Sequence, residues 1–260
     1  MLTLDRNLLH RFGLLLVILF VGLFLSLSTD TFLSVANLTN VARQISINGI
    51  LAIGVTFVLL TGGVDLSLGS VVALSGVACA TFAHPGDHSV FVPIAVGLLT
   101  GAACGLVNGT LVTLGGVAPF IVTLGMMTIA RGLALIFSGG RPVADMSNEL
   151  TALAGDLFGI PIPMLCFAGV AAAAWFFLSN FRLGRHIYAV GGNENAARAA
   201  GVPVEQVKLF AYGLCGLLAG LAGVVLAARI TTGQPNAGQA YELDAIAAVV
   251  IGGTSLAGGV

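Results

Sequence analysis

The sequence has very few charged residues. Asp, Glu, Lys and Arg make up only 8% of its 260 residues, whereas a typical soluble domain carries about 25%. Apolar residues make up 57% of the chain, so a soluble fold of this composition could not cover its surface with polar groups. The apolar residues must face a solvent other than water. The composition therefore predicts a protein embedded in a lipid bilayer.

The chain also lacks the residues that several chemistries need. Its one lysine, Lys208, is followed by Leu209, so no Gly-x-x-x-x-Gly-Lys-Ser/Thr loop can hold the phosphates of ATP. No Gly-x-Ser-x-Gly elbow and no His-Glu-x-x-His zinc motif occurs. The four cysteines lie in apolar segments without Cys-x-x-Cys spacing, which is typical of small buried residues. We therefore expect no catalytic residue, cofactor, metal, disulfide or nucleic-acid partner.

Long apolar runs are what the sequence has instead. A helix needs about 20 mostly apolar residues to cross a bilayer, and backbone polar groups cannot stay unpaired in lipid. Seven segments qualify as membrane helices, and an eighth is too short to span and is interpreted as re-entrant or unfinished. They are residues 12–28, 45–61, 66–83, 90–114, 119–138, 161–180, 208–229 and, as the short one, 241–251. The expected fold is an all-α polytopic transmembrane bundle of seven to eight segments, with short broken or re-entrant helices, in a single domain over residues 1–260.

The arginines in the short loops predict the orientation of the bundle. Arg6 and Arg11 precede the first apolar run, and three further arginines lie in the loop 181–207. The loop 84–89 has no arginine, and the loop 139–160 has one arginine against three acidic residues. Because cytoplasmic loops of membrane proteins are enriched in Lys and Arg, the N-terminus and the loop 181–207 are predicted to be cytoplasmic.

Glycine is abundant, with 36 residues, and many glycines recur at the spacing of one helical turn. Small residues at this spacing allow membrane helices to approach closely, so that dispersion contacts hold them together. The sequence therefore predicts a tightly packed bundle. The clearest series are Gly101, Gly105 and Gly109 in one apolar segment and Gly213, Gly216 and Gly220 in another.

A short helix is predicted at residues 193–201, inside the loop 181–207. Asn193 can cap its N-terminus, and Glu194 is four residues before Arg198, the spacing of a helical ion pair. Gly201 suits the left-handed position that follows a helix. A helix of two turns is not stable alone in water, so a partner protein is expected to hold it. An ordinary ordered loop is the alternative interpretation.

The stretch 61–70, Thr-Gly-Gly-Val-Asp-Leu-Ser-Leu-Gly-Ser, interrupts an apolar region. Two glycines break the helix, and Asp65 is placed to cap the next one. An acidic group at membrane depth usually has a function, and broken helices are typical of transport sites. The alternative is a simple cap near the membrane surface. A similar acidic and glycine-rich pattern surrounds residues 241–251, as an inverted repeat would produce.

Four blocks of sequence carry a resemblance to a known family. They are Gly62-Gly63-Val64-Asp65-Leu66-Ser67-Leu68-Gly69-Ser70; Pro119-Phe120-Ile121-Val122-Thr123-Leu124-Gly125 with Arg131-Gly132; residues 184–201, which begin Gly-Arg-His-Ile-Tyr-Ala-Val-Gly-Gly-Asn-Glu; and residues 241–259, which begin Tyr-Glu-Leu-Asp-Ala-Ile and end Gly-Gly-Thr-Ser-Leu-Ala-Gly-Gly. Together they cover essentially the whole chain. In these blocks the sequence resembles the permease subunits of ribose-type ABC sugar importers.

The resemblance implies a multi-pass subunit of the bacterial inner membrane that forms a homodimer. It also implies two cytoplasmic ATPase subunits and a periplasmic sugar-binding protein as partners, with lipid around the spans. The loop 181–207 then carries a coupling helix seated in the ATPase. Family members continue past the last block with further helices, so we expect this chain to lack its C-terminal helices. The residues assigned to coupling are Asn193, Glu194, Asn195, Ala197, Arg198 and Gly201.

The implied function is translocation of a monosaccharide, ribose-like or a related sugar or polyol. A neutral sugar needs hydroxyl, amide and carboxylate partners rather than unpaired buried charge, although hydrogen bonding between helices is the alternative role of each candidate. The candidate residues of the translocation path are Asn48, Asp65, Asn108, Thr123 and Thr128.

Two other classes of protein were weighed against the ABC permease. A secondary transporter of a small polar solute would need ion-coupling carboxylates in mid-span, and Asp65 is the one candidate in the first seven segments. A membrane-embedded enzyme would need His, Asp or Glu converging on helix faces, and the sequence shows no such pattern.

Overall fold

The computed structural model describes residues 6–86 and 88–259. Asp87, in the predicted outer loop, and the side chains of Arg6 and Arg11 lie outside the described part. The chain forms two compact units, residues 1–44 and 45–260. The first unit holds α1 (Arg6–Ser28) and the beginning of α2 (Val35–Leu60).

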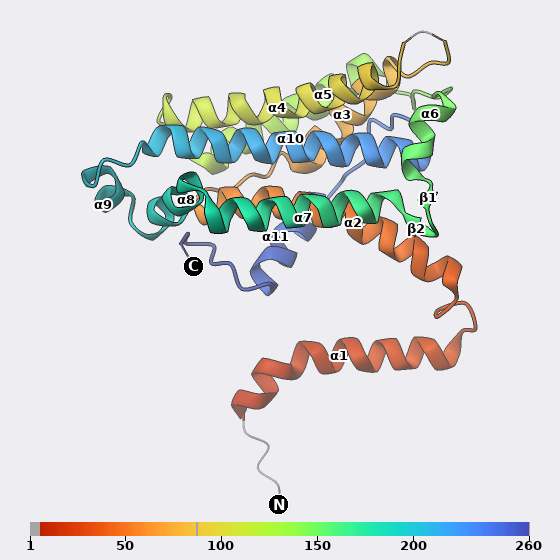
Figure 1. The fold of residues 1–260 in the computed structure, drawn as a ribbon, viewed down its shortest axis with the longest axis horizontal. Helices are drawn as coiled ribbons and strands as arrows, with labels where there is room; N and C mark the ends of the chain where they lie inside the picture. The colour runs from red at the N-terminus through yellow and green to blue at the C-terminus, as the bar shows by residue number, and fades with distance from the viewer. Residues whose placement is uncertain (1–5, 87, 260) are drawn as a thin grey trace, which may run out of the picture. The chain divides into compact units, whose positions relative to one another are not determined.

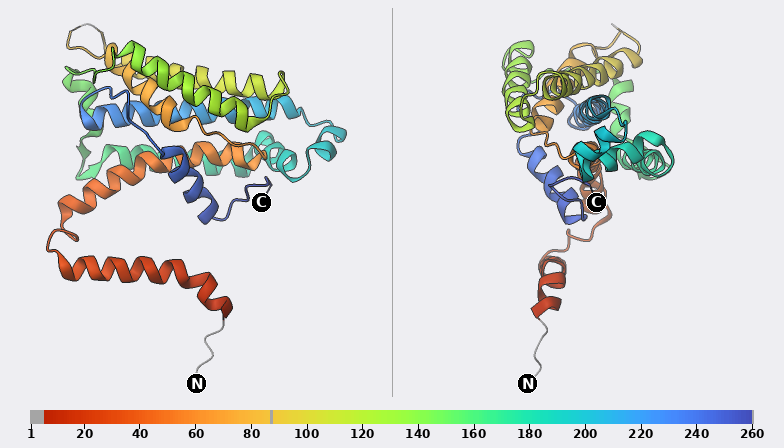
Figure 2. Two further views of the ribbon diagram at one scale, coloured as in Figure 1. Left: turned by 180° about the vertical axis from the view of Figure 1, so that it is seen from behind. Right: turned by 90° about the vertical axis from the view of Figure 1, so that its left-hand side faces the viewer.

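The second unit holds the rest of α2 and every later element. These are α3 (Leu68–Thr81), α4 (Phe91–Thr113), α5 (Pro119–Phe137), α6 (Asn148–Thr151), the 3₁₀ turn η1 (Ala152–Ala154), the antiparallel strands β1 (Asp156–Leu157) and β2 (Ile160–Pro161), α7 (Ile162–Asn180), α8 (Arg182–Gly192), α9 (Glu194–Ala199), α10 (Val204–Ile230) and α11 (Tyr241–Ile251). In Figure 1 the helices α4, α5, α7 and α10 run side by side. Figure 2, from behind, also places α8 and α9 at one end of these helices and α6 with the strands at the other.

The predicted all-helical membrane bundle is confirmed. In the described residues, α2, α4, α5, α7 and α10 are long and apolar enough to cross a membrane. The segment 66–83, predicted as a full span, forms only the 14-residue α3. At 1.5 Å per residue this helix is about 21 Å long, shorter than the roughly 30 Å hydrocarbon core. The first residues of the segment belong instead to the non-helical break 61–67.

Burial divides the second unit into inner and outer helices. In their most apolar stretches, 67% of the residues of α10 are buried, against 6% for α7. Nearly all of α3 is buried as well, whereas α4 and α5 bury one face and expose large apolar side chains on the other, such as Leu99 and Ile136. Exposed apolar faces are what helices in contact with lipid require. The inner helix α10 is therefore the element around which this unit is built.

The predicted glycine packing is confirmed between α4 and α10. A Cβ atom added to Gly105 would lie 2.9 Å from the Cα of Gly216, and one added to Gly216 would lie 2.7 Å from the Cα of Gly105. A Cβ on Gly101 would similarly lie 2.6 Å from the Cα of Gly220. The two backbones thus touch directly over about two turns, a contact that any side chain would prevent.

Candidate functional site

The break between α2 and α3 lies inside the second unit. Gly62 adopts φ +75°, a left-handed conformation that ends α2 and favours glycine. The hydroxyl of the fully buried Tyr212 donates a hydrogen bond of 3.2 Å to the carbonyl of Val64. Tyr212 lies eight residues after the start of α10 at Val204, which is about 12 Å along the helix axis. This depth favours a break within the membrane over a cap near its surface.

A chain of hydrogen bonds connects the break to α4. Asp65 is only 1% exposed, and its Oδ1 accepts from the backbone N–H of Ser67 at 2.9 Å and from the Ser67 hydroxyl at 2.6 Å. The fully buried Asn108 donates from Nδ2 to the Ser67 Oγ at 3.0 Å. Buried polar groups must be hydrogen-bonded to be tolerated, and these three satisfy one another. Residues 65, 67 and 108 therefore anchor the break to α4.

Asp65 does not cap α3, as the sequence had predicted. The N-cap residue of α3 is Ser67, which makes no side-chain cap hydrogen bond in the helix. Asp65 instead closes the turn that precedes the helix, because its carboxylate reaches the Ser67 N–H two residues on. The short side chain of Asp65 is thus used inside the break, and not at the helix terminus.

The other candidate path residues lie apart from this anchor. The hydroxyl of Thr123 is buried and bonds back to the carbonyl of Pro119 at 2.9 Å, and that of Thr128 bonds back to Leu124 at 3.1 Å. Asn48 is half-buried, and its Oδ1 has no hydrogen-bond partner in the described residues. Only Asp65 and Asn108 of the five predicted residues are brought together, through Ser67.

Replacing Asp65 tests the anchor. Asp65→Ala leaves the Ser67 N–H and hydroxyl without their acceptor, and buried unsatisfied donors cost about 1–3 kcal/mol each. Asp65→Asn keeps an acceptor oxygen, so we expect it to retain most of the stability that Asp65→Ala loses. Thermal unfolding of the detergent-purified chain measures both, with Thr128→Ala as a control on an exposed hydroxyl. Equal losses for Asn and Ala at position 65 would show that the charge, and not the hydrogen bonds, holds the break.

A second cross-connection holds the segment 231–240 between α10 and α11. Arg131 of α5 donates from Nη1 to the carbonyls of Pro235 and Ala237, both at 2.7 Å. On the other side, the backbone of Gly238 approaches Gly69 of α3 so closely that a Cβ on Gly69 would collide with its carbonyl oxygen. The arginine side chain therefore fixes a non-helical segment against the start of α3.

The helix predicted at residues 193–201 is present as α9. Asn193 is its N-cap and accepts from the Ala196 N–H at 3.0 Å, as predicted. Gly201 has φ +80° and follows the helix in the predicted left-handed position. Ala197 is 5% exposed and faces inward, whereas Asn195 is exposed. The sequence signals at both ends of this helix were therefore sufficient to place it.

Ion pairs fasten α9 to the first turns of α10. The Glu194 carboxylate binds Lys208 Nζ at 2.6 Å and Arg198 Nη2 at 3.3 Å, and Arg198 also pairs with Glu205. The hydrogen bond from Lys208 lowers the pKa of Glu194 below its ordinary 4.5. The carboxylate therefore stabilises the folded state above pH 4.5, and this contribution is lost as the pH falls through the lowered folded pKa. Any one exposed pair is worth little, but the four groups form a network.

The sequence analysis missed several residues of these sites. The Arg198–Glu194 pair was predicted, but Lys208 and Glu205 were not, because they pair with α9 across the turn at Gly201. The helix α8 was not predicted either. Its buried Gly184, Ile187 and Val190 recur at helical spacing, a signal that could have identified it.

A helical bundle with a broken inner helix and a charged helix fixed to its central element is the architecture of a membrane transport protein. Residues 37–260 match the family described as branched-chain amino acid transport system / permease component. The ribose import permease protein RbsC of Escherichia coli K12 is 44% identical over 97% of this chain and 79% of its own length. The D-allose transport system permease protein AlsC of the same strain is 40% identical over 92% of the chain and 74% of its length.

The L-arabinose ABC transporter permease protein AraH of Azospirillum brasilense is also 40% identical, over 98% of this chain and 75% of its own length. No solved structure matches the chain. The chain belongs to this family of permease components, which confirms the resemblance seen in the four sequence blocks. It is a multi-pass membrane permease of an ABC transporter rather than an enzyme.

Proposed function

We propose that this chain forms the translocation path of an ATP-driven importer for a monosaccharide of the ribose, allose or arabinose class. The curated relatives that match nearly all of the chain are permeases for these sugars. The family description mentions branched-chain amino acids, but identities of 40–44% to sugar permeases favour a sugar. The observation that carries the proposal is the attachment of the exposed helix α9 to the inner helix α10.

This attachment provides a direct path for force. A movement imposed on α9 reaches α10 through the short connection after Ala199 and through the pairs of Glu194 with Lys208 and Arg198 with Glu205. Because α10 is the most buried long helix, it would transmit that movement to α3 and α4, which pack against it. A cytoplasmic ATPase seated on α9 would supply the movement, and Asn195 and Arg198 present exposed polar groups to it.

The remaining partners follow from the same proposal. A periplasmic binding protein would deliver the sugar, and a second copy of the chain would complete the path. Of the predicted path residues, the exposed Thr128 and the half-buried Asn48 with its free Oδ1 can reach a sugar hydroxyl. Asp65 is enclosed by its hydrogen bonds and serves as an anchor, which weakens the alternative of an ion-coupled secondary transporter.

Cysteine labelling tests the proposed orientation. Asn195 in α9 and Ala144 in the connection after α5 are both exposed, so a cysteine at either position is accessible to reagent. In a chain whose native cysteines are replaced by alanine, we expect a membrane-impermeant maleimide to label Asn195→Cys only from the cytoplasm. Ala144→Cys should react only from outside. Labelling of both positions from one side would overturn the orientation.

Sugar uptake by proteoliposomes tests the function. The chain is reconstituted with its ATPase and binding protein, and uptake of radiolabelled ribose, allose and arabinose is compared with that of leucine. Accumulation of at least one sugar, and not of leucine, is expected. Accumulation of leucine alone would replace the proposed substrate class by the one in the family description.

A further inference from the structure

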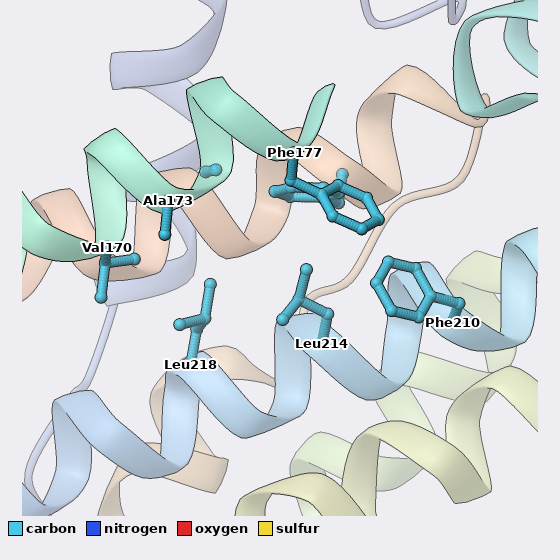
Figure 3. Close-up of a pocket in the computed structure, with 8 residues that line it drawn as sticks. Val170, Ala173, Phe177, Phe210, Leu214 and Leu218 are labelled. Carbon is cyan, nitrogen blue, oxygen red and sulfur yellow. The ribbon is translucent and has the colours of Figure 1, made fainter. Parts of the chain in front are cut away.

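An apolar groove runs between α7 and α10, with α2 beneath it. Its cavity volume is about 240 Å³, and it is open to the outside along one side. Figure 3 shows Val170, Ala173 and Phe177 on α7 facing Phe210, Leu214 and Leu218 on α10 across the groove. Every lining residue is apolar, so the groove offers no hydrogen bond to a sugar or to water. An empty apolar groove at membrane depth loses dispersion contacts, which a flexible hydrocarbon chain can restore.

Aromatic rings extend one end of this groove toward two arginines. Phe177 stacks on Phe210 with ring centroids 5.4 Å apart and on Phe181 at 5.1 Å. Phe181 immediately precedes Arg182, and its carbonyl accepts the backbone N–H of Arg185 in the first turn of α8. The groove therefore ends within one helical turn of both guanidinium groups.

These two arginines are available to a ligand. Both side chains are exposed, and neither has an ion pair or side-chain hydrogen bond within the described part of the chain. By contrast, Arg198 and Lys208 are occupied by carboxylates. A guanidinium group binds phosphate oxygens in a planar two-bond geometry. Basic groups beside membrane helices on the cytoplasmic side are the usual site for anionic lipid headgroups.

We propose that this groove binds one anionic phospholipid. An acyl chain lies between α7 and α10, and the phosphate binds Arg182 and Arg185. The bound lipid would join α7, which buries little of itself, to the inner helix that continues from α9. The inference rests on the membrane location and proposed orientation of the chain, and not on which sugar it carries.

A second groove provides a matched comparison. It lies between α4 and α10, has a similar cavity volume of about 250 Å³, and is also lined only by apolar residues, including Ala102 and Leu106. Its α4 wall differs in charge, because α4 contains no charged residue. A lipid held by hydrocarbon contacts alone would occupy both grooves equally, whereas a lipid chosen for its phosphate would prefer the groove beside α8.

Native mass spectrometry of the full chain tests the proposal with an equimolar mixture of phosphatidylglycerol and phosphatidylcholine. We expect one phosphatidylglycerol to be retained in preference to phosphatidylcholine. Loss of one basic contact should weaken binding about fivefold, so Arg182→Gln is expected to show that loss and the Arg182→Gln/Arg185→Gln pair a roughly twentyfold loss. Arg141→Gln, an exposed arginine in the connection after α5, is the charge control and should change nothing.

Filling the grooves separates the hydrocarbon contribution. Ala173→Trp should displace the lipid, whereas Ala102→Trp in the comparison groove should not. Unchanged lipid retention by the double arginine variant, which alters only exposed side chains, would overturn the proposal. Equal loss from Ala102→Trp and Ala173→Trp would also overturn it. A change of dimer fraction in Ala173→Trp without loss of lipid would assign the groove to a second copy of the chain instead.

Discussion

Ala197→Pro is expected to abolish sugar uptake while leaving membrane insertion intact. Ala197 is buried on the inner side of α9, and its N–H donates to the carbonyl of Asn193 at 2.9 Å. Proline removes this donor and clashes with the preceding turn, at a cost of about 3 kcal/mol or more in a helix interior. A helix of 6 residues has no remaining turn to compensate. The surface proposed to dock the ATPase should therefore be lost, whereas the apolar spans are unaffected.

The measurement compares sugar uptake with ATP hydrolysis in the same reconstituted complex. We expect uptake below a tenth of the wild-type rate, and hydrolysis that no longer responds to sugar-loaded binding protein. Asn195→Ala is the control, because it truncates an exposed side chain of the same helix without removing a backbone donor. A well-expressed Ala197→Pro chain with normal uptake would show that α9 does not couple the ATPase to transport.

Gly105→Ala is expected to destabilise the bundle strongly for so small a change. The added Cβ would meet the backbone of α10 at Gly216 and the carbonyl of Tyr212, neither of which is a flexible side-chain end. Overpacking of this kind costs about 1–3 kcal/mol. It would also separate α4 from α10 near Asn108, which anchors the α2–α3 break. Loss of transport should therefore accompany the loss of stability.

Gly125→Ala is the matched control, since a Cβ at this helical position in α5 meets nothing within 4 Å. There the substitution should be neutral or stabilise by up to roughly 1 kcal/mol, as expected for Gly to Ala in a helix. Thermal unfolding of the detergent-purified chains measures both changes. Equal melting temperatures for the two variants would show that close backbone contact between α4 and α10 is not required.

Local signals in the sequence were enough to place most helices. The bounds predicted for residues 119–138 and 161–180 differ little from α5 and α7, because each begins beside a proline and contains an uninterrupted apolar run. Asn193 and Gly201 likewise identified both ends of α9. Glycine spacing identified the surfaces of α4 and α10 that pack together.

Contacts between distant residues could not be predicted in the same way. The sequence pointed to Asp65 and Asn108 separately, but their connection depends on Ser67, which is 41 residues from Asn108. Nothing local identifies Tyr212 as the donor to Val64, 148 residues away. The length of α3 was overestimated because hydropathy does not distinguish a buried extended segment from a buried helix.

The energy source of transport tests the central claim most directly. Proteoliposomes containing the chain, its ATPase and its binding protein are loaded with ATP or with a non-hydrolysable analogue, and sugar uptake is followed with and without an imposed proton gradient. An ABC permease predicts uptake that requires ATP hydrolysis and binding protein and is indifferent to the gradient. Uptake driven by the gradient in the absence of ATP would contradict the account and favour a secondary transporter.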